Sequence, residues 1–287
     1  MFGRPSSAPT TEIEDGGVRL DLSGPVLTRC LESLVAGSEA QGGIETYVRA
    51  LGFKSALFQE VLSDEQRERM SAATFEGLCA FMSTVRRRVA PALQREGIES
   101  IRSALEILLD GAADTSTTDA RIKTFCARFP DDRSHRWVRD LAAEILHNVD
   151  PERYPLMMRW VWDAKVNTGV LREIWYQADK DHRVIDVPDD YATFLLLRQE
   201  LSQFLTDNGV YRDVPIYVDM LCAQVYAEYI SSQGGSYLRA DFSSPDDPLQ
   251  YTRRLLGLDG IDTETGRTRF KALTGEAHVV EDAKLLN

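Results

Sequence analysis

One short stretch of this chain combines opposite charges with large aromatic residues at helical spacing. Arg159 and Asp163 stand four residues apart and flank Trp160 and Trp162. On an α-helix, residues at positions i and i+4 are neighbours, so these two side chains could form an ion pair. Charged groups with perturbed environments concentrate at binding and catalytic sites. The pair is therefore the first candidate site, and the alternative is a structural ion pair at a helix edge.

The residues that follow this pair could bind an anion. The segment Lys165–Gly169 is typical of a turn, and Lys165 and Arg172 supply positive charge around Asn167. The start of the next helix offers amide groups that have no partner within the helix. Thr168 could instead cap that helix through its hydroxyl group. The complete set of candidate binding residues is His147, Tyr154, Arg159, Trp160, Asp163, Lys165, Asn167 and Arg172.

A helix that begins near Ser134 should carry His147 close to its end. A histidine at that position more often interacts with the helix dipole than takes part in catalysis. Arg136, Asp140 and Glu144 repeat at four-residue spacing on one side of this helix, and apolar residues occupy the other side. We expect the three charged residues to form a solvent-exposed ladder of ion pairs.

The element expected to hold the Arg159–Asp163 pair is a helix over about residues 154–165. Its apolar residues point in every direction of the helical wheel, which is typical of a helix surrounded by other helices. Pro151 and Pro155 predict a sharp entry into this helix, because each proline fixes its own φ and biases the preceding residue away from helix. All four tryptophans of the chain lie in or near this segment, at positions 137, 160, 162 and 175.

Helical periodicity covers almost the whole chain, which predicts an all-α fold of about ten helices around the central tryptophan-rich helix. Residues 1–20 are rich in Pro, Ser, Thr and Gly and predict a disordered arm. Residues 21–256 are expected to form one helical domain, with a possible sub-boundary near 111–118. Residues 257–287 are expected to form a loose tail.

Two local signals refine this outline. Ser63 and Gln66 resemble a capping box that opens a long helix, which Pro91 would end or kink. Pairs of aspartates at expected helix starts are interpreted as caps and not as magnesium ligands. These pairs are Asp131-Asp132, Asp189-Asp190 and Asp246-Asp247.

Composition and missing motifs narrow the function. The net charge of −12 disfavours a general polyanion binder, although residues 119–180 are close to neutral. Phosphate-loop, dinucleotide-binding, zinc-hydrolase and serine-hydrolase motifs are absent, and the four histidines lack metal-ligand spacing. We expect no metal and no cofactor. The cysteines are expected to be reduced and buried, and they are Cys30, Cys79, Cys126 and Cys222.

The leading hypothesis is a soluble, cytoplasmic accessory protein that binds another protein through a helical groove. The chain has no apolar run long enough to span a membrane and no signal peptide, so we expect no membrane association. The alternative is an enzyme or small-molecule binding protein with its site around Arg159 and Asp163. A weaker alternative, with nucleic acid an improbable partner, is contact through Arg133, Arg136, Arg139 and Lys165.

Overall fold

The computed structural model describes residues 20–39, 41–176, 184–233 and 249–262, together with residues 265 and 267. This part of the chain holds eleven α-helices, two short 3-10 helices and no β-strand. The prediction of an all-α fold is confirmed. The α-helices are α1 (Gly24–Glu39), α2 (Ile44–Val61), α3 (Asp64–Arg69), α4 (Ala72–Cys79), α5 (Val89–Leu109), α6 (Thr118–Cys126), α7 (Trp137–Val149), α8 (Val170–Glu173), α9 (Tyr191–Asp207), α10 (Val214–Gln233) and α11 (Gln250–Leu255).

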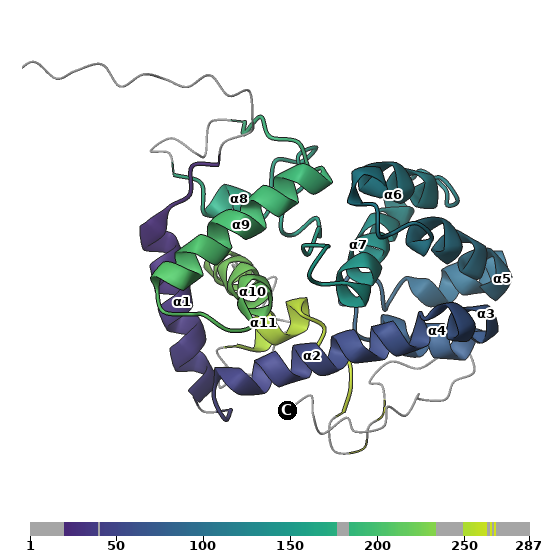
Figure 1. The fold of residues 1–287 in the computed structure, drawn as a ribbon, viewed down its shortest axis with the longest axis horizontal. Helices are drawn as coiled ribbons and strands as arrows, with labels where there is room; N and C mark the ends of the chain where they lie inside the picture. Colours follow the sequence, from purple (N-terminus) through teal and green to yellow (C-terminus); the bar gives the residue numbers. More distant parts are fainter. Residues whose placement is uncertain are drawn as a thin grey trace, which may run out of the picture.

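The helices form two groups that α2 joins. Helices α1, α8, α9, α10 and α11 lie on one side of the molecule, and α3 to α7 lie on the other (Figure 1). Helix α2 runs along both groups and contacts α1 and α10 in the first, and α3, α4 and α7 in the second. The segment 111–118 links α5 to α6, which pack against each other. Side chains of α2, α7 and α10 therefore meet where the two groups adjoin.

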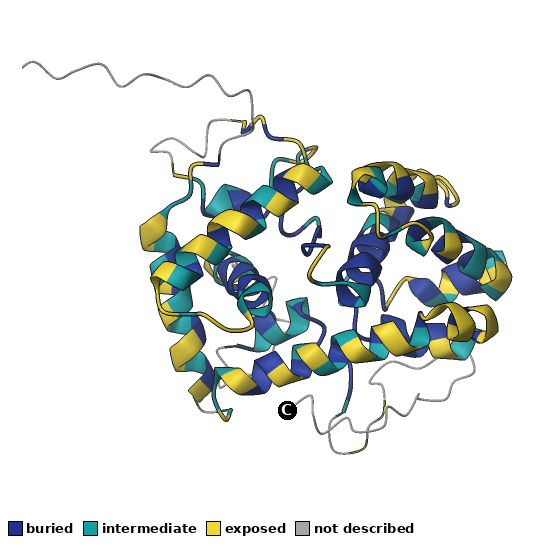
Figure 2. Cartoon of the chain, viewed as in Figure 1, coloured by how far each residue is buried: buried dark blue, intermediate teal, exposed yellow. Residues whose placement is uncertain are grey.

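Helix α7 is the most deeply enclosed helix of the described chain. Every residue from Trp137 to Asn148 is buried except Arg139, whereas α2 alternates buried and exposed faces (Figure 2). Asp140 and Glu144 are each only 1 % exposed. The expected solvent-exposed ladder is therefore wrong, because both carboxylates point into the protein and pair with cations from other elements.

The predicted central helix over 154–165 is also wrong. Residues 154–158 are extended or irregular, 159–161 form a turn, and Asp163 and Thr168 form an isolated antiparallel bridge. The segment is nevertheless buried, and Trp162 is completely enclosed with its indole N–H donating to the Val187 carbonyl oxygen at 3.0 Å. The periodicity therefore indicated burial correctly and helix incorrectly.

Other elements provide the hydrogen bonds that a helix would have supplied to this buried segment. Pro155 has no N–H group and disfavours helix at Tyr154. The Tyr154 carbonyl oxygen accepts a hydrogen bond from His147, and the Arg159 amide donates to the Asp140 carboxylate. Amide groups at the start of α8 donate to two further carbonyl oxygens of the segment. Because buried backbone groups need partners, these bonds allow the irregular path.

Gly169 makes this close approach to α8 possible. Its φ is +125°, and a Cβ atom there would lie 2.7 Å from the Val161 carbonyl oxygen. A side chain at this position would push the irregular segment away from α8. Gly169 also occupies the N-cap position of α8, without a side-chain capping bond, so Thr168 does not cap that helix as predicted.

The long helix predicted to open at Ser63 is divided into shorter pieces. Ser63 precedes α3 but makes no side-chain capping bond, whereas the Ser71 hydroxyl accepts the Thr74 amide and caps α4. Pro91 lies in the first turn of α5, where the missing N–H costs nothing, and does not end the preceding helix. Two of the aspartate caps are confirmed, since Asp132 accepts from Ser134 and Asp190 accepts from Thr193. Asp246-Asp247 lie outside the described residues.

The start of the predicted tail packs against the body of the protein. Gly257 and Gly260 lie so close to the backbone of residues 80–81 that a Cβ atom would be 1.6 Å and 2.1 Å from its carbonyl oxygens. Arg86 makes two hydrogen bonds to Asp259, at 2.6 and 2.9 Å. Residues 268–287 and the predicted arm up to residue 19 lie outside the described residues. No helix of the described chain has the length and apolar character needed to cross a bilayer.

Candidate functional site

The two residues of the predicted ion pair bind different partners. Arg159 forms a two-pronged ion pair with Asp140, with nitrogen–oxygen distances of 3.0 and 2.6 Å. Asp163 lies 3.3 Å from Arg136 and accepts the Val166 amide at 3.1 Å. The i,i+4 pairing is therefore wrong, because Arg159 and Asp163 do not share a helix. The Asp140 carboxylate also accepts the Arg159 amide, so three N–H groups occupy it.

The predicted anion site is occupied by the protein's own backbone. The Asn167 amide group donates to the Ile185 carbonyl oxygen at 2.9 Å and accepts the Ile185 N–H at 3.1 Å. Arg172 donates to the same Asn167 oxygen at 2.5 Å. Asn167 has a φ of +57° at the tip of the turn, and Lys165 is exposed. Asn167 and Arg172 thus come together as predicted, but they hold the segment around residue 185 in place.

A pocket of about 230 Å³ lies elsewhere, between α2, α7 and the start of α10. Its floor contains buried ionisable groups, and its rim contains exposed or half-exposed apolar residues. We name it the α2–α7–α10 pocket. The floor residues are Lys54, Glu144, His147, Asn148 and Asp219, and the rim residues include Leu51, Gly52, Ala56, Pro151, Pro215 and Ile216.

One half of the floor is a buried ion pair. The Lys54 ammonium lies 2.9 Å from the Glu144 carboxylate, and their side chains are 4 % and 2 % exposed. Lys54 also donates to the Leu256 carbonyl oxygen at 3.0 Å, and Asn148 donates to Glu144 at 3.0 Å. A buried ion pair depends on further hydrogen bonds to its groups, and these two bonds supply one to Lys54 and one to the Glu144 oxygen that binds it.

The other half of the floor is a histidine–aspartate pair. His147 Nε2 lies 2.9 Å from Asp219 Oδ2, and Nδ1 donates to the Tyr154 carbonyl oxygen at 2.8 Å. Burial acts to lower the pKa of His147, but Asp219, the bond to Tyr154 and the charge of Glu144 together raise that pKa above its usual value. His147 is near the end of α7 as predicted, but its partner is a carboxylate of α10.

The remaining predicted residues lie outside the pocket. The Tyr154 hydroxyl donates to the Ala112 carbonyl oxygen and accepts from Arg121 at 2.6 Å, so it links the irregular segment to the α5–α6 connection. Trp160 is buried with its ring centroid 5.8 Å from that of Tyr226. Of the eight predicted binding residues, only His147 lines the α2–α7–α10 pocket.

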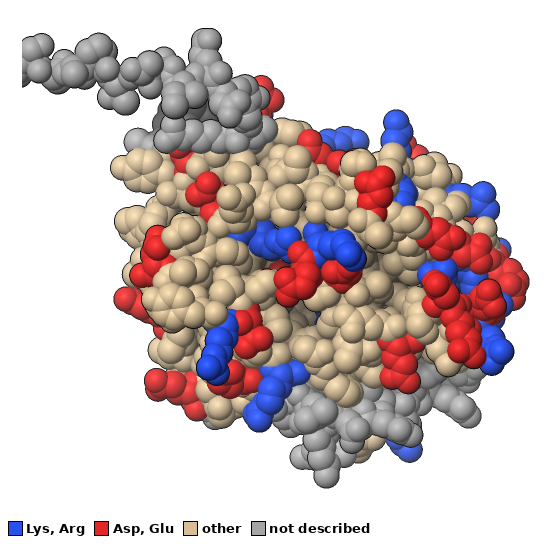
Figure 3. Space-filling model, in the orientation of Figure 1, with Lys and Arg blue, Asp and Glu red and all other residues tan. Residues whose placement is uncertain are grey.

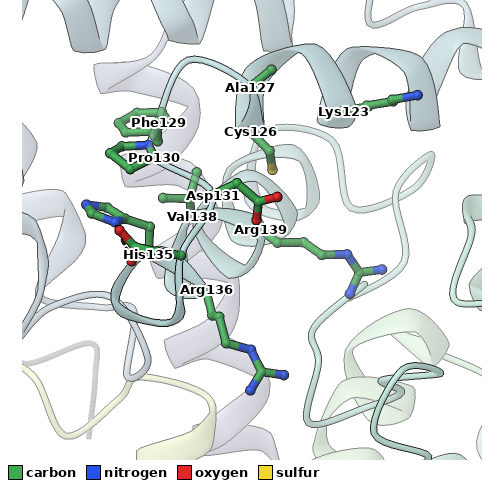
Figure 4. A pocket seen from close by; sticks show the side chains of 11 residues that line it. Lys123, Cys126, Ala127, Phe129, Pro130, Asp131, His135, Arg136, Val138 and Arg139 are labelled. Carbon is green, nitrogen blue, oxygen red and sulfur yellow. Dashed lines mark hydrogen bonds and ion pairs between the residues drawn. The ribbon is translucent and has the colours of Figure 1, made fainter.

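A second, more open groove lies along α6 and the start of α7. It measures about 540 Å³, and an adjoining pocket of about 380 Å³ shares Lys123, Cys126 and Arg139 with it. In Figure 4, Lys123, Arg136 and Arg139 extend toward one side of the groove, and Phe129 and Pro130 lie on the other.

The four cations predicted to contact nucleic acid do not form one free basic surface. Arg136 pairs with Asp163, and Arg139 donates to the Asp189 carbonyl oxygen at 2.6 Å, while Arg133 and Lys165 are exposed. Basic and acidic side chains are interspersed across the face in Figure 3.

The cysteine thiols are poor nucleophiles. Burial raises the pKa of all four, to about 11 for Cys126 and to about 12 for Cys30, where nearby Glu228 adds to the effect. Thiolate chemistry near neutral pH is therefore disfavoured. Within the described residues, no three His, Cys, Asp or Glu side chains are grouped so as to hold a metal ion.

Sequence reasoning missed four of the five floor residues, Lys54, Glu144, Asn148 and Asp219. Lys54 and Asp219 stand on helices far along the chain from α7, and Glu144 was assigned to an exposed face. The only available signal was the spacing of Glu144, His147 and Asn148, which places all three on one side of α7. Comparisons of this chain with protein-family models, with curated proteins and with solved structures returned no match.

Proposed function

We propose that this protein binds a small molecule in the α2–α7–α10 pocket. The observation that carries the proposal is the combination of buried charge with open space. Four ionisable side chains, each at most 10 % exposed, line a pocket whose rim is apolar and reachable from solvent. Pockets with an apolar wall and a few converging polar groups are the usual form of small-molecule sites.

The pocket supports binding better than acid–base turnover by His147. Both ring nitrogens of His147 are engaged, one with the Tyr154 carbonyl oxygen and the other with Asp219. A general base must have a free nitrogen within hydrogen-bond reach of the proton that it removes. The histidine therefore orients Asp219, and the floor acts as a fixed set of polar contacts.

The experiment is a fragment screen by ¹H–¹⁵N NMR on the full chain. Fragments that occupy the pocket should shift amide resonances of α2, α7 and α10 together. Gly52→Leu should abolish those shifts, because Gly52 lines the pocket and no atom lies within 4 Å of the position of an added Cβ, so a leucine side chain can occupy that space. Gln66→Leu is the matched control, since Gln66 is exposed on α3 and does not line the pocket. A screen without any fragment whose shifts depend on position 52 would overturn the proposal.

A protein partner is the second candidate function, and the groove along α6 and α7 supports it. The groove is open, and it combines Phe129 and Pro130 with charged side chains (Figure 4). A peptide segment of a partner could lie in such a groove. Pull-down with wild type and with Ala127→Arg tests this, because Ala127 is exposed and lines the groove. A stoichiometric partner retained equally by both chains would argue against this groove.

Two further proposals accompany these functions. We place the protein in the cytoplasm, on the ground that its cysteines are free thiols among the described residues. Nucleic acid is the least supported partner, because the net charge is −12 and two of the four proposed cations are paired with acidic residues.

A further inference from the structure

Building on the proposed function, we infer that the α2–α7–α10 pocket selects a small aliphatic primary amine, whose ammonium group contacts the floor and whose chain lies in the apolar mouth. The inference depends on the proposed binding site and adds the chemical class of its ligand.

Three oxygen atoms of the floor have no hydrogen-bond donor within the described chain. They are Glu144 Oε1, Asp219 Oδ1 and Asn148 Oδ1. The other polar atom of each side chain is engaged: Glu144 Oε2 binds Lys54, Asp219 Oδ2 binds His147, and Asn148 Nδ2 donates to Glu144. Asn148 donates to two acceptors, the Glu144 side chain and carbonyl, which fixes the orientation of its amide. None of the three oxygens belongs to the fully enclosed polar atoms that lack partners, so each keeps some access to solvent, and all three residues line the pocket.

The floor therefore offers acceptors in excess of donors. Two of the three Lys54 protons are used, by Glu144 and by the Leu256 carbonyl oxygen. A primary ammonium group has three donors and no acceptor, which matches three free oxygens. A carboxylate or phosphate ligand would instead meet the free carboxylate oxygens of Glu144 and Asp219, which repel it and donate no hydrogen bond.

The mouth of the pocket suits an aliphatic chain. Its walls include Leu51, Ala56, Leu156 and Ile216, and no Phe, Tyr or Trp side chain of the described residues lines the pocket. Gly52 lies in the interior of α2, where alanine would be favoured, and no atom lies within 4 Å of the position of an added Cβ. The missing side chain leaves the entrance open. A volume of about 230 Å³ equals roughly eight water molecules of about 30 Å³ each, enough for a chain of about four carbons.

The charges around the floor predict how binding depends on pH. Lys54 of α2 and Glu144 of α7 neutralise each other, and protonated His147 neutralises Asp219, with the neutral Cys222 thiol next to Asp219. An additional ammonium group is better accommodated when His147 has lost its proton. Amine affinity should therefore increase as the pH rises through the pKa of His147.

The test uses n-butylammonium, with 1-butanol and n-butyrate as neutral and anionic probes of similar size. Titration of the full chain by ¹H–¹⁵N NMR should show n-butylammonium binding at least tenfold more tightly than either other probe. Affinity should rise between pH 6 and pH 8.5. Gly52→Leu should weaken n-butylammonium binding at least tenfold, and Gln66→Leu should leave it unchanged. Asp219→Asn should weaken n-butylammonium binding as well. If Asp219→Asn does not fold, Gly52→Leu alone tests whether the amine binds in this pocket.

Failure of this inference is distinguishable from failure of the proposed function. If 1-butanol or n-butyrate shifts the same amide resonances and binds as tightly as n-butylammonium, the pocket binds small molecules and the amine assignment is wrong. If none of the three probes binds while the fragment screen finds position-52-dependent ligands, the amine assignment is again wrong. If the screen also finds none, both the function and the ligand class are overturned.

Discussion

Asp140 and Glu144 lie one turn apart on α7 and are buried to the same extent, but their surroundings differ. Asp140 accepts three N–H groups of Arg159 and lines none of the described pockets. Glu144 uses one oxygen for Lys54 and Asn148, its other oxygen has no donor among the described residues, and Glu144 lines the α2–α7–α10 pocket. The comparison teaches that a buried carboxylate with a cationic partner does not by itself mark a site. Unused hydrogen-bonding capacity beside open space does.

The largest effect on stability is expected at Asp140, whose carboxylate lines none of the described pockets. Asp140→Ala leaves the Arg159 guanidinium without its partner in a mostly buried position, which should lower the free energy of unfolding by about 3–5 kcal/mol. Urea denaturation measures the change. Arg136→Ala is the control, because its pair with Asp163 is 44 % exposed on the arginine side and should contribute at most about 1 kcal/mol. Equal losses of unfolding free energy in the two variants would contradict the assignment of Asp140 to a buried, fully hydrogen-bonded ion pair.

A somewhat smaller effect on stability is expected at the Lys54–Glu144 pair in the pocket floor. Lys54→Met leaves Glu144 without its cation and should cost about 3 kcal/mol of unfolding free energy. Adding Glu144→Gln removes the stranded charge and should restore most of that loss, because the ion pair and its neutral replacement differ little in net stability. Denaturation of the two single variants and the double variant gives the coupling energy. A double variant as unstable as the sum of the singles would show that the two residues act independently.

The pH dependence of stability should distinguish the pocket floor, which contains His147, from the surroundings of Asp140. The pKa of His147 is raised in the folded protein, so protonated His147 stabilises the fold fully below its unfolded pKa of about 6.5. That stabilisation should be lost as the pH rises through the raised folded pKa. His147→Gln should remove this loss from the wild-type profile, measured by denaturation from pH 5.5 to 9. Asp140→Asn should retain it, and an unchanged profile in His147→Gln would contradict the His147–Asp219 assignment.

The smallest effects concern two glycines. Gly52→Ala should raise the unfolding free energy by about 0.5–1 kcal/mol, because the site is helical and open. Gly169→Ala should lower it by more than about 1 kcal/mol, because the added Cβ would lie 2.7 Å from the Val161 carbonyl oxygen at a positive φ. Thermal unfolding of both variants measures the difference. A lower unfolding free energy in both variants would show that the mouth of the pocket is as closely packed as the irregular segment.

Much of the outline follows from local sequence. The all-α architecture, the position of α7, the burial of the tryptophan segment and the caps at Asp132 and Asp190 are all confirmed. Helical periodicity and capping depend on residues within one or two turns of each other, so a single sequence contains them.

The partners of the buried charges were decided by the tertiary structure alone. Arg159 binds a residue 19 positions away, and Lys54 binds one 90 positions away, which no local pattern specifies. The same holds for the irregular path of residues 154–163, where side chains and amides of α7 and α8 replace helical hydrogen bonds. The sequence alone determined which segments are apolar and which are charged. Only the packing of distant helices decided which carboxylates have all their hydrogen-bonding capacity used and which keep an oxygen without a donor beside a pocket. The outcome depends on the groups that long-range contacts bring next to each carboxylate.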